Sequence, residues 1–402
     1  MVFKINGGKM DKRLCKFMRI LLTTNIVLFP FCGCKSDSFK QDASGDSYSN
    51  IQMNIGQDML AYCKEDNRFY VLDYENMEQS LLCNKPNCRH TGNDCIMTRL
   101  YRNAPVFHDT CAYYFVDDKP EMVQDKDLNV KLKQGSNLCC YDFTTQTEKQ
   151  LLHIEDASVS DGNGELLLHD DTLYYSKTVF HPATDENGAA VGFVGAGGDV
   201  SLAAIHLPDL KQEDLGSLYN YVELTKYYPM TPNSAHIFMA GLFDNRIYYN
   251  VAFVQGSGDP TVAGNYYYNF YVTYYDLSDG TYHGTPEDYE HIDFAQVMYL
   301  SDDYLVIRRD NQISVTKKGS DQQVTLTDES INDCSSISVF DDKVFCDGKI
   351  YDLNSKEVRE SKLLKPDPEL LAKEVITKYK NSFILRDVSQ NFEKIPAEEL
   401  LK

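Results

Sequence analysis

One alternation of apolar and polar positions recurs along the chain. A short apolar run leads into a few polar residues that include Asp or Asn, and a run rich in Tyr, Phe and Val follows. Alternating side chains on both sides of such a turn are typical of antiparallel β-hairpins. The clearest copies cover residues 106–116, 167–176, 242–254, 299–308 and 339–346, with weaker copies at 53–63 and 376–386.

A second hairpin pattern follows several of these copies. Here a strand ends in an aromatic residue and Asp, before a polar turn and another strand, as in residues 68–83, 138–153 and 349–360. Two hairpins make a four-stranded sheet that cannot cover its own faces, and radial stacking of such sheets gives a β-propeller. We therefore predict an all-β propeller of four-stranded antiparallel blades over residues 51–402. Seven blades are favoured over six, and an irregular pair of β-sandwiches is the competing architecture.

The connections between strands differ in length in a regular way. With the strands of each repeat labelled A to D, the A–B and C–D turns are short. The B–C connections of repeats 2, 3 and 4 are long (117–136, 181–199 and 255–265), and so are the connections 84–104 and 218–236 between repeats. In an up-and-down blade, B–C and D–A connections leave from the same end. We predict that they form one long-loop face, over repeats 1 to 4, which is the working surface.

The N-terminus has the pattern of a secretory signal. A basic stretch precedes the apolar run ILLTTNIVLFPF, which is too short to span a bilayer permanently. The run ends at FCGC, where Gly33 and Cys34 resemble the lipobox of bacterial lipoproteins. We predict a lipoprotein signal peptide at 1–33, lipidation of Cys34, and a flexible tether at 34–50. Because Phe31 departs from the usual aliphatic residue, an ordinary signal peptide cut nearby is the alternative.

The predicted mature chain is strongly acidic. The full sequence has a net charge of −21, and residues 1–33 hold six Lys or Arg and one Asp, so the remainder carries −26. Such a charge repels nucleic acid and anionic headgroups. We therefore expect no nucleic-acid partner, contact with the membrane only through the lipid anchor, and a location on the extracytoplasmic face of the cell membrane.

The segment CNKPNCRHTGNDC is the one compact chemical cluster in the sequence. Cys83, Cys88, His90 and Cys95 are spaced C-x4-C-x-H-x4-C, and three Cys with one His make an ordinary tetrahedral shell for structural zinc. Nine cysteines follow Cys34, an odd number that cannot all pair internally. Exported proteins often use disulfides, so a disulfide staple or mixed use is an alternative. A catalytic thiol has little support, because no His and Asp or Asn partners are marked elsewhere.

The remaining cysteines fall in or beside predicted strands. Cys139 and Cys140 are adjacent on one strand, so their side chains point to opposite faces, and only one can reach Cys111 on a neighbouring strand. Small size and apolar character favour burial for the others. These are Cys63, Cys334 and Cys346.

Tyrosines gather near two of the long connections. Exposed aromatic rings with polar tips can stack on sugars or grip a peptide. Tyr is also a common strand residue, and the absence of Trp weakens a carbohydrate interpretation. The candidate ligand-binding residues are Tyr219, Tyr221, Tyr227 and Tyr228 in one connection, and Tyr266, Tyr267 and Tyr268 beside another.

The FCGC motif, the segment LLCNKPNCRHTGNDC and the repeated hairpins ending in YYD together resemble a group of lipoproteins from Gram-positive anaerobes. Proteins of that group carry a β-propeller domain of unknown function. The resemblance covers most of the mature chain, and its most specific element is Cys83, Pro86, Cys88, His90 and Cys95. It implies surface exposure and a propeller, and it brings no catalytic residues to transfer.

These patterns favour a binding or scaffold protein over an enzyme. The expected ligand is a glycan, peptide or protein recognised by the long-loop face. The alternative is a propeller enzyme, a hydrolase or lyase acting on polysaccharide or peptide with carboxylates near the central channel. A third alternative is a purely structural envelope protein.

Overall fold

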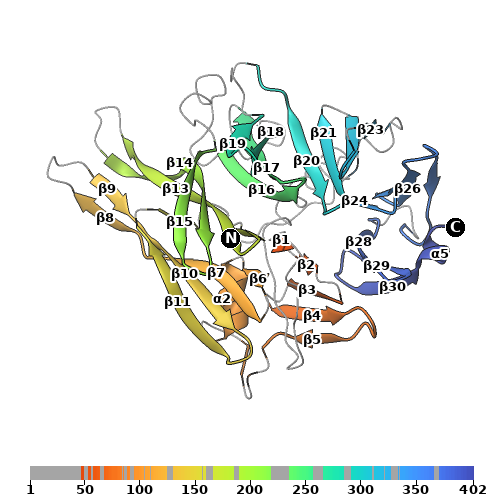
Figure 1. The fold of residues 1–402 in the computed structure, drawn as a ribbon, viewed down its shortest axis with the longest axis horizontal. Coiled ribbons are helices and arrows are strands. Elements are labelled where there is room, and N and C mark those ends of the chain that lie inside the picture. The colour runs from red at the N-terminus through yellow and green to blue at the C-terminus, as the bar shows by residue number, and fades with distance from the viewer. Residues whose placement is uncertain are drawn as a thin grey trace, which may run out of the picture.

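The chain folds into seven antiparallel sheets arranged in a ring, as Figure 1 shows. The prediction of an all-β propeller with seven blades is confirmed, and both the six-bladed and the sandwich alternatives are wrong. The computed structural model describes residues 47–48, 53–55, 58–63, 68–83, 85, 88–90, 95–103, 105–108, 110–124, 130–155, 157–159, 166–184, 190–218, 235–256, 266–284, 291–309, 312–320, 322–326, 334, 336–365 and 371–402.

The blades follow one another along the chain, and strands A to D of each blade are hydrogen-bonded in sequence order. Blade 1 consists of β2 (Met53–Ile55), β3 (Met59–Cys63), β4 (Phe69–Asp73) and β5 (Gln79–Leu81). Blade 2 consists of β6 (Val106–His108), β7 (Cys111–Asp117), β10 (Ser136–Asp142) and β11 (Thr147–Ile154). Blade 3 consists of β12 (Leu166–His169), β13 (Thr172–Thr184), β14 (Ala190–His206) and β15 (Lys211–Ser217).

The second half of the ring repeats this order. Blade 4 consists of β16 (Ala235–Phe243), β17 (Arg246–Gly256), β18 (Tyr266–Asp276) and β19 (Thr281–His283). Blade 5 consists of β20 (Ala295–Leu300), β21 (Tyr304–Arg309), β22 (Gln312–Lys317) and β23 (Gln323–Thr325). Blade 6 consists of β24 (Ile337–Phe340), β25 (Lys343–Cys346), β26 (Lys349–Asp352) and β27 (Val358–Glu360). The described part of blade 7 has three strands, β28 (Glu374–Tyr379), β29 (Ser382–Arg386) and β30 (Phe392–Pro396).

A few elements lie outside the blade pattern. The short strand β1 (Ser47–Tyr48) pairs with the innermost strand of blade 3, β12. A hairpin of β8 (Glu121–Gln124) and β9 (Val130–Lys133) is inserted between the B and C strands of blade 2. Helix α2 (Ile96–Arg102) connects blades 1 and 2, and α5 (Ala397–Leu400) ends the chain. No helix among the described residues is long and apolar enough to cross a membrane.

Aspartate and asparagine form the A–B turns in three blades. Both residues of each pair have positive φ: 45° and 60° at Asp170–Asp171, 51° and 65° at Asp244–Asn245, and 51° and 58° at Asp341–Asp342. Two-residue turns of this kind match the right-handed twist of a hairpin, and Asp and Asn tolerate the left-handed region better than most residues. The polar pair in the repeated pattern therefore sets the turn.

Aspartates at the ends of the C strands explain the aromatic–Asp pattern of the second hairpin in several repeats. Asp73, Asp142, Asp276 and Asp352 each end a C strand, and Oδ1 of each accepts a hydrogen bond from the backbone amide two residues later, at 2.7–2.9 Å. Side chains that bond the following backbone in this way stabilise a turn. The C–D turns thus carry their own carboxylate acceptor.

Apolar clusters join every neighbouring pair of blades. One cluster joins blades 7, 1 and 2 through residues such as Ile384, Phe69 and Tyr114, and five further clusters join blades 2–3, 3–4, 4–5, 5–6 and 6–7. Each sheet therefore buries both faces against its neighbours. Burial of this apolar surface, at about 25 cal/mol per Å², is the main force that holds the ring together.

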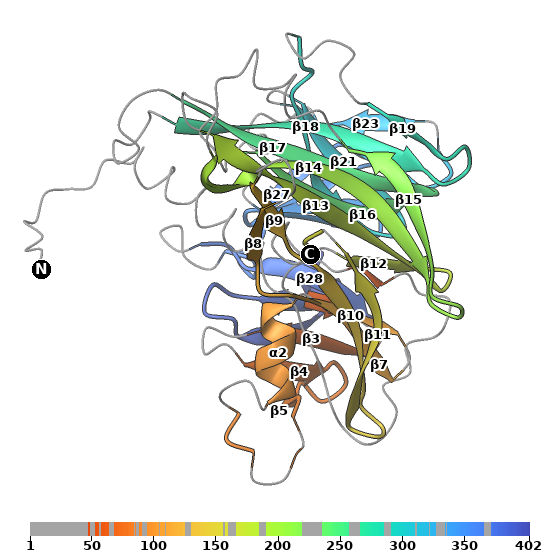
Figure 2. The same cartoon turned by 90° about the vertical axis from the view of Figure 1, so that its left-hand side faces the viewer.

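Part of the long-loop face consists of strands rather than loops. Residues 181–184 and 190–199 continue β13 and β14, residues 255–256 end β17, and β8–β9 occupies much of 117–136. Figure 2 shows these extensions on the side of the molecule away from the β14–β15 turn. Strand β9 also contacts β13. A hairpin that continues beyond the sheet satisfies its backbone hydrogen bonds internally, so strand structure persists even where Gly is frequent.

Candidate metal centre

The four residues of the predicted cluster converge in the structure. Cys83 follows β5 closely, and Cys95 lies immediately before α2. One ligand atom from each of Cys83, Cys88, His90 and Cys95 lies within 4.8 Å of the others, and Cys95 Sγ is 3.9 Å from His90 Nδ1. Ligand atoms around a tetrahedral zinc ion lie roughly 3.5–3.8 Å apart, given bonds of about 2.1–2.3 Å. The set needs little adjustment to close around one ion.

Backbone amides support the three sulfur atoms in a regular pattern. The amide of His90 donates to Cys88 Sγ at 3.4 Å. Backbone hydrogen bonds also reach Cys83 from Lys85 and Cys95 from Met97, so each sulfur accepts a bond from the residue two positions later. Outer hydrogen bonds of this type orient thiolate ligands and stabilise their negative charge.

Burial and hydrogen bonding affect the three thiols differently. The bond from the His90 amide lowers the pKa of Cys88 below its ordinary value. Burial raises the pKa of Cys83, and it raises the pKa of Cys95 to about 12. Without a nearby positive charge, the two buried thiols therefore resist ionisation at neutral pH.

The oxidation state distinguishes this cluster from another cysteine pair. Cys83, Cys88 and Cys95 are all free thiols in the structure. Cys334 and Cys346, by contrast, form a disulfide, with Cα atoms 5.9 Å apart. Both are buried, but the interpretation of this pair as merely small buried residues is wrong.

Two other thiols lie close together on blade 2. Cys140 and Cys111 are hydrogen-bonded through their side chains, while Cys139 is buried on the opposite face of β10. Only one of the adjacent cysteines thus reaches Cys111, as the alternation of side chains predicts. None of the three forms a disulfide.

Helix α2 ties the cluster to the junction of blades 1 and 2. Met97 and Leu100 are fully buried in the apolar cluster that joins these blades. Arg99 forms an ion pair with Glu148 of β11, and the Tyr114 hydroxyl donates to the other oxygen of Glu148 at 2.5 Å. An ion held by the four residues would therefore fix the start of a helix that packs across two blades.

A second group of possible ligands consists of Asp276, Asp279 and His283. Their charges already have protein partners: Asp276 accepts from Arg246 at 2.9 Å, and Asp279 contacts His283 Nε2 at 3.0 Å. Backbone amides of Ser278 and Thr281 supply further bonds. These contacts account for the three residues as parts of the C–D hairpin of blade 4.

Several predicted site residues lie where their side chains are not described. Tyr266, Tyr267 and Tyr268 belong to the first part of β18, and only their backbone is described. Outside the described residues lie Cys34, Tyr219, Tyr221, Tyr227 and Tyr228.

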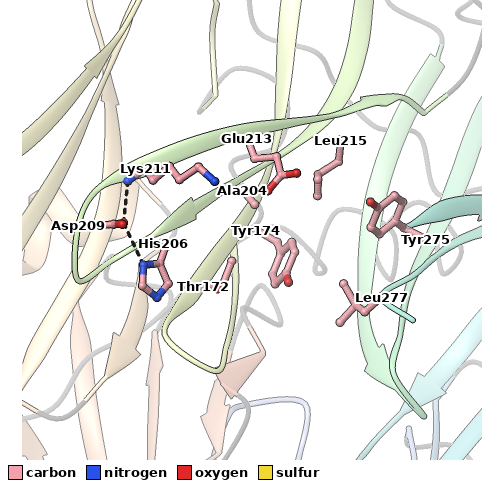
Figure 3. A pocket seen from close by; sticks show the side chains of 10 residues that line it. All are labelled: Thr172, Tyr174, Ala204, His206, Asp209, Lys211, Glu213, Leu215, Tyr275 and Leu277. Carbon is pink, nitrogen blue, oxygen red and sulfur yellow. Dashed lines mark hydrogen bonds and ion pairs between the residues drawn. The ribbon is translucent and has the colours of Figure 1, made fainter. Parts of the chain in front are cut away.

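The structure also contains a groove that the sequence analysis did not predict. It lies between blades 3 and 4, has a volume of about 470 Å³, and is shown in Figure 3. Residues of the C–D turns, Asp209 and Leu277, contribute to its lining, so it lies at the end of the blades away from the long-loop face. In the sequence, the groove is indicated only by Lys211, Glu213 and Leu215, which alternate along one strand. This alternation does not predict which blade faces them.

Comparison with known proteins gives distant structural matches. No family profile and no curated protein matches the sequence. An oligogalacturonate lyase in complex with manganese matches with 12% identity and a TM-score of 0.40, covering 94% of this chain and 98% of the lyase. Dipeptidyl peptidase 4 of Porphyromonas gingivalis matches with 7% identity and a TM-score of 0.32, covering 89% of this chain and 54% of the peptidase. Similarity at this level transfers no activity to the chain.

Proposed function

We propose that the protein is a lipid-anchored, extracytoplasmic propeller that binds a ligand or scaffolds a partner with its long-loop face, and that zinc at Cys83, Cys88, His90 and Cys95 holds part of that face. The observation that carries the proposal is the construction of the face. Hairpin β8–β9, the extensions of β13–β14 and β17–β18, and helix α2 all belong to B–C or D–A connections. Ordered elements raised from a rigid ring provide a preorganised surface for recognition.

The Cys334–Cys346 disulfide supports the extracytoplasmic part of the proposal. Stable disulfides are common in exported proteins and rare in the reducing cytosol. The lipid on Cys34 can be tested by metabolic labelling with an alkyne-modified fatty acid. The native chain should incorporate the label and fractionate with membranes, and Cys34→Ala should lose both properties. Equal labelling of the two chains would contradict lipidation at this residue.

The binding role can be tested by removing one element of the face. Residues 119–134 would be replaced by Asn-Gly, a two-residue turn suited to joining β7 and β10. Purified native and shortened proteins would be screened against an oligosaccharide and peptide array. At least one ligand should bind the native protein and lose at least tenfold in affinity with the shortened one. Cleavage of an array ligand by the native protein would instead favour the enzyme alternative.

Metal analysis with thiol counting tests the zinc centre. Native protein purified without chelator should contain one zinc per chain, with Cys83, Cys88 and Cys95 becoming reactive only after metal removal. Cys88→Ser should lose most of the zinc. Cys139→Ser, a change at a free thiol outside the cluster, should retain it. Disulfides among the three cluster cysteines in zinc-free native protein would reject the metal centre.

A further inference from the structure

The groove between blades 3 and 4 results from the register of the blade 3 sheet. Tyr174, Ala204 and Glu213 form one row across β13, β14 and β15. Thr172, His206 and Lys211 form the next row. The groove lies over the first row, because the small side chain of Ala204 at its centre leaves space between Tyr174 and Glu213.

Blade 4 provides the facing wall, as Figure 3 shows. Tyr275 is 7% exposed and belongs to the apolar cluster between the two blades, together with Leu277, Leu215 and Tyr174 at its edge. The spacing of the walls is held by Tyr282, whose hydroxyl donates to the Gly216 carbonyl of blade 3 at 3.1 Å. The groove therefore has an apolar floor between two blades that are fixed to each other.

Polar groups of both signs surround this floor. His206 Nδ1 lies 2.9 Å from Asp209 Oδ1, which also accepts from the Lys211 amide at 3.1 Å. Neither the Lys211 ammonium nor the Glu213 carboxylate forms a hydrogen bond or ion pair with another described residue. Burial raises the pKa of Tyr174 to about 12, so its hydroxyl remains a donor at neutral pH.

These groups restrict the class of ligand. An anion would meet Glu213 and Asp209, a cation would meet Lys211, and a fully apolar molecule would leave the polar rim unsatisfied. A neutral molecule with an apolar face and many hydroxyl groups satisfies donors, acceptors and aromatic rings together. The volume of about 470 Å³ lies within the range of small-molecule sites, about 300–1,000 Å³.

We propose that this groove binds a neutral saccharide of one or two pyranose rings. The Tyr174 and Tyr275 rings contact the apolar face of a sugar, Glu213 accepts from its hydroxyls, and Lys211 donates to them. Because the groove lies at the opposite end of the blades from the long-loop face, this site does not depend on the ligand proposed for that face.

The test uses the native chain with three probes, cellobiose, maltose and diacetylchitobiose, measured by saturation-transfer NMR and titration calorimetry. At least one sugar should receive saturation from the protein. Glu213→Gln and Lys211→Met should each weaken its binding at least tenfold, because hydrogen bonds to charged groups are the stronger ones. The matched controls Glu360→Gln and Lys362→Met change exposed residues near blade 6 and should bind like the native chain.

Three results would overturn the proposal. In the first, none of the three sugars receives saturation from the protein. In the second, a sugar binds, but both groove variants bind it as tightly as the native chain does. In the third, acetate alone or tetramethylammonium alone displaces the bound sugar. The variant in which residues 119–134 are replaced tests this site independently of the long-loop face. It should keep sugar binding whether or not the long-loop face recognises a ligand.

Discussion

Lys394, in the last blade, donates a hydrogen bond from Nζ to the carbonyl oxygen of Tyr74 in the first blade, at 2.9 Å. The same Nζ lies 3.2 Å from the Glu75 carbonyl oxygen and 5.0 Å from the ring centroid of Tyr379. In the described part of the chain, blades 7 and 1 share no strand. The ring is therefore closed by side chains that bridge blades 7 and 1. The same junction contains an apolar contact between Tyr62 and Phe392, whose ring centroids are 4.6 Å apart.

Removal of the Lys394 ammonium should weaken this closure. Lys394→Met keeps the apolar stem but loses both carbonyl contacts, so we expect the free energy of unfolding to fall by about 1–3 kcal/mol. Urea unfolding followed by circular dichroism measures the change. Lys362→Met, at an exposed lysine outside the junction, is the control and should change the free energy by less than about 0.5 kcal/mol. Equal effects of the two variants would show that the closure does not depend on Lys394.

The fold was predictable because its main signals are local. Asp341 and Asp342 predict the turn that they form, and Asp352 predicts the next turn. Each of these residues determines the backbone conformation within a few positions of itself. The spacing of Cys83 and Cys95 likewise predicted a shared site, which their convergence in the structure supports.

Other features depend on contacts that sequence patterns do not contain. Helix α2 has only seven residues, and Met97 and Leu100 stabilise it through burial between two blades rather than through local propensity. The groove depends on the pairing of Ala204 with Glu213, and a bulge in β15 at Leu215, opposite Leu202 and Ala203 of β14, sets that register. A one-residue difference there would turn Glu213 to the other face of the sheet.

The disulfide of blade 6 should contribute measurably to stability. It joins residues 12 positions apart, and cross-links of this span typically stabilise a fold by about 2–3 kcal/mol. The double variant Cys334→Ala/Cys346→Ala should lose about that amount in urea unfolding. Cys111→Ala/Cys140→Ala removes two blade 2 thiols that form no disulfide and serves as the control. An unchanged midpoint for the first variant would contradict a stabilising cross-link.

Acid should remove the contribution of Asp276. The bond from Arg246 lowers the pKa of this carboxyl from 3.8 to about 2, so the folded state binds the proton more weakly than the unfolded chain. The resulting stabilisation is fully present above about pH 4 and is lost as the pH falls toward 2. Asp276→Asn should therefore cost about 1 kcal/mol at pH 6, discounted for the exposure of Arg246, and less at pH 3. A cost independent of pH would show that the charge of Asp276 does not stabilise the turn.

The ion pair between Arg99 and Glu148 provides a readout of the proposed metal centre. Arg99 lies on α2 one turn after Cys95, so its reach to Glu148 depends on where the helix begins. A double-mutant cycle with Arg99→Met and Glu148→Gln measures the coupling of the pair. In zinc-loaded protein we expect about 1 kcal/mol, because both side chains are partly buried, with 35% and 24% of their surfaces exposed. With Cys88→Ser as the background, the helix start is no longer held and the coupling should fall toward zero. The same coupling in both backgrounds would show that α2 is positioned by packing alone and that a metal ion at the four ligands does not orient it.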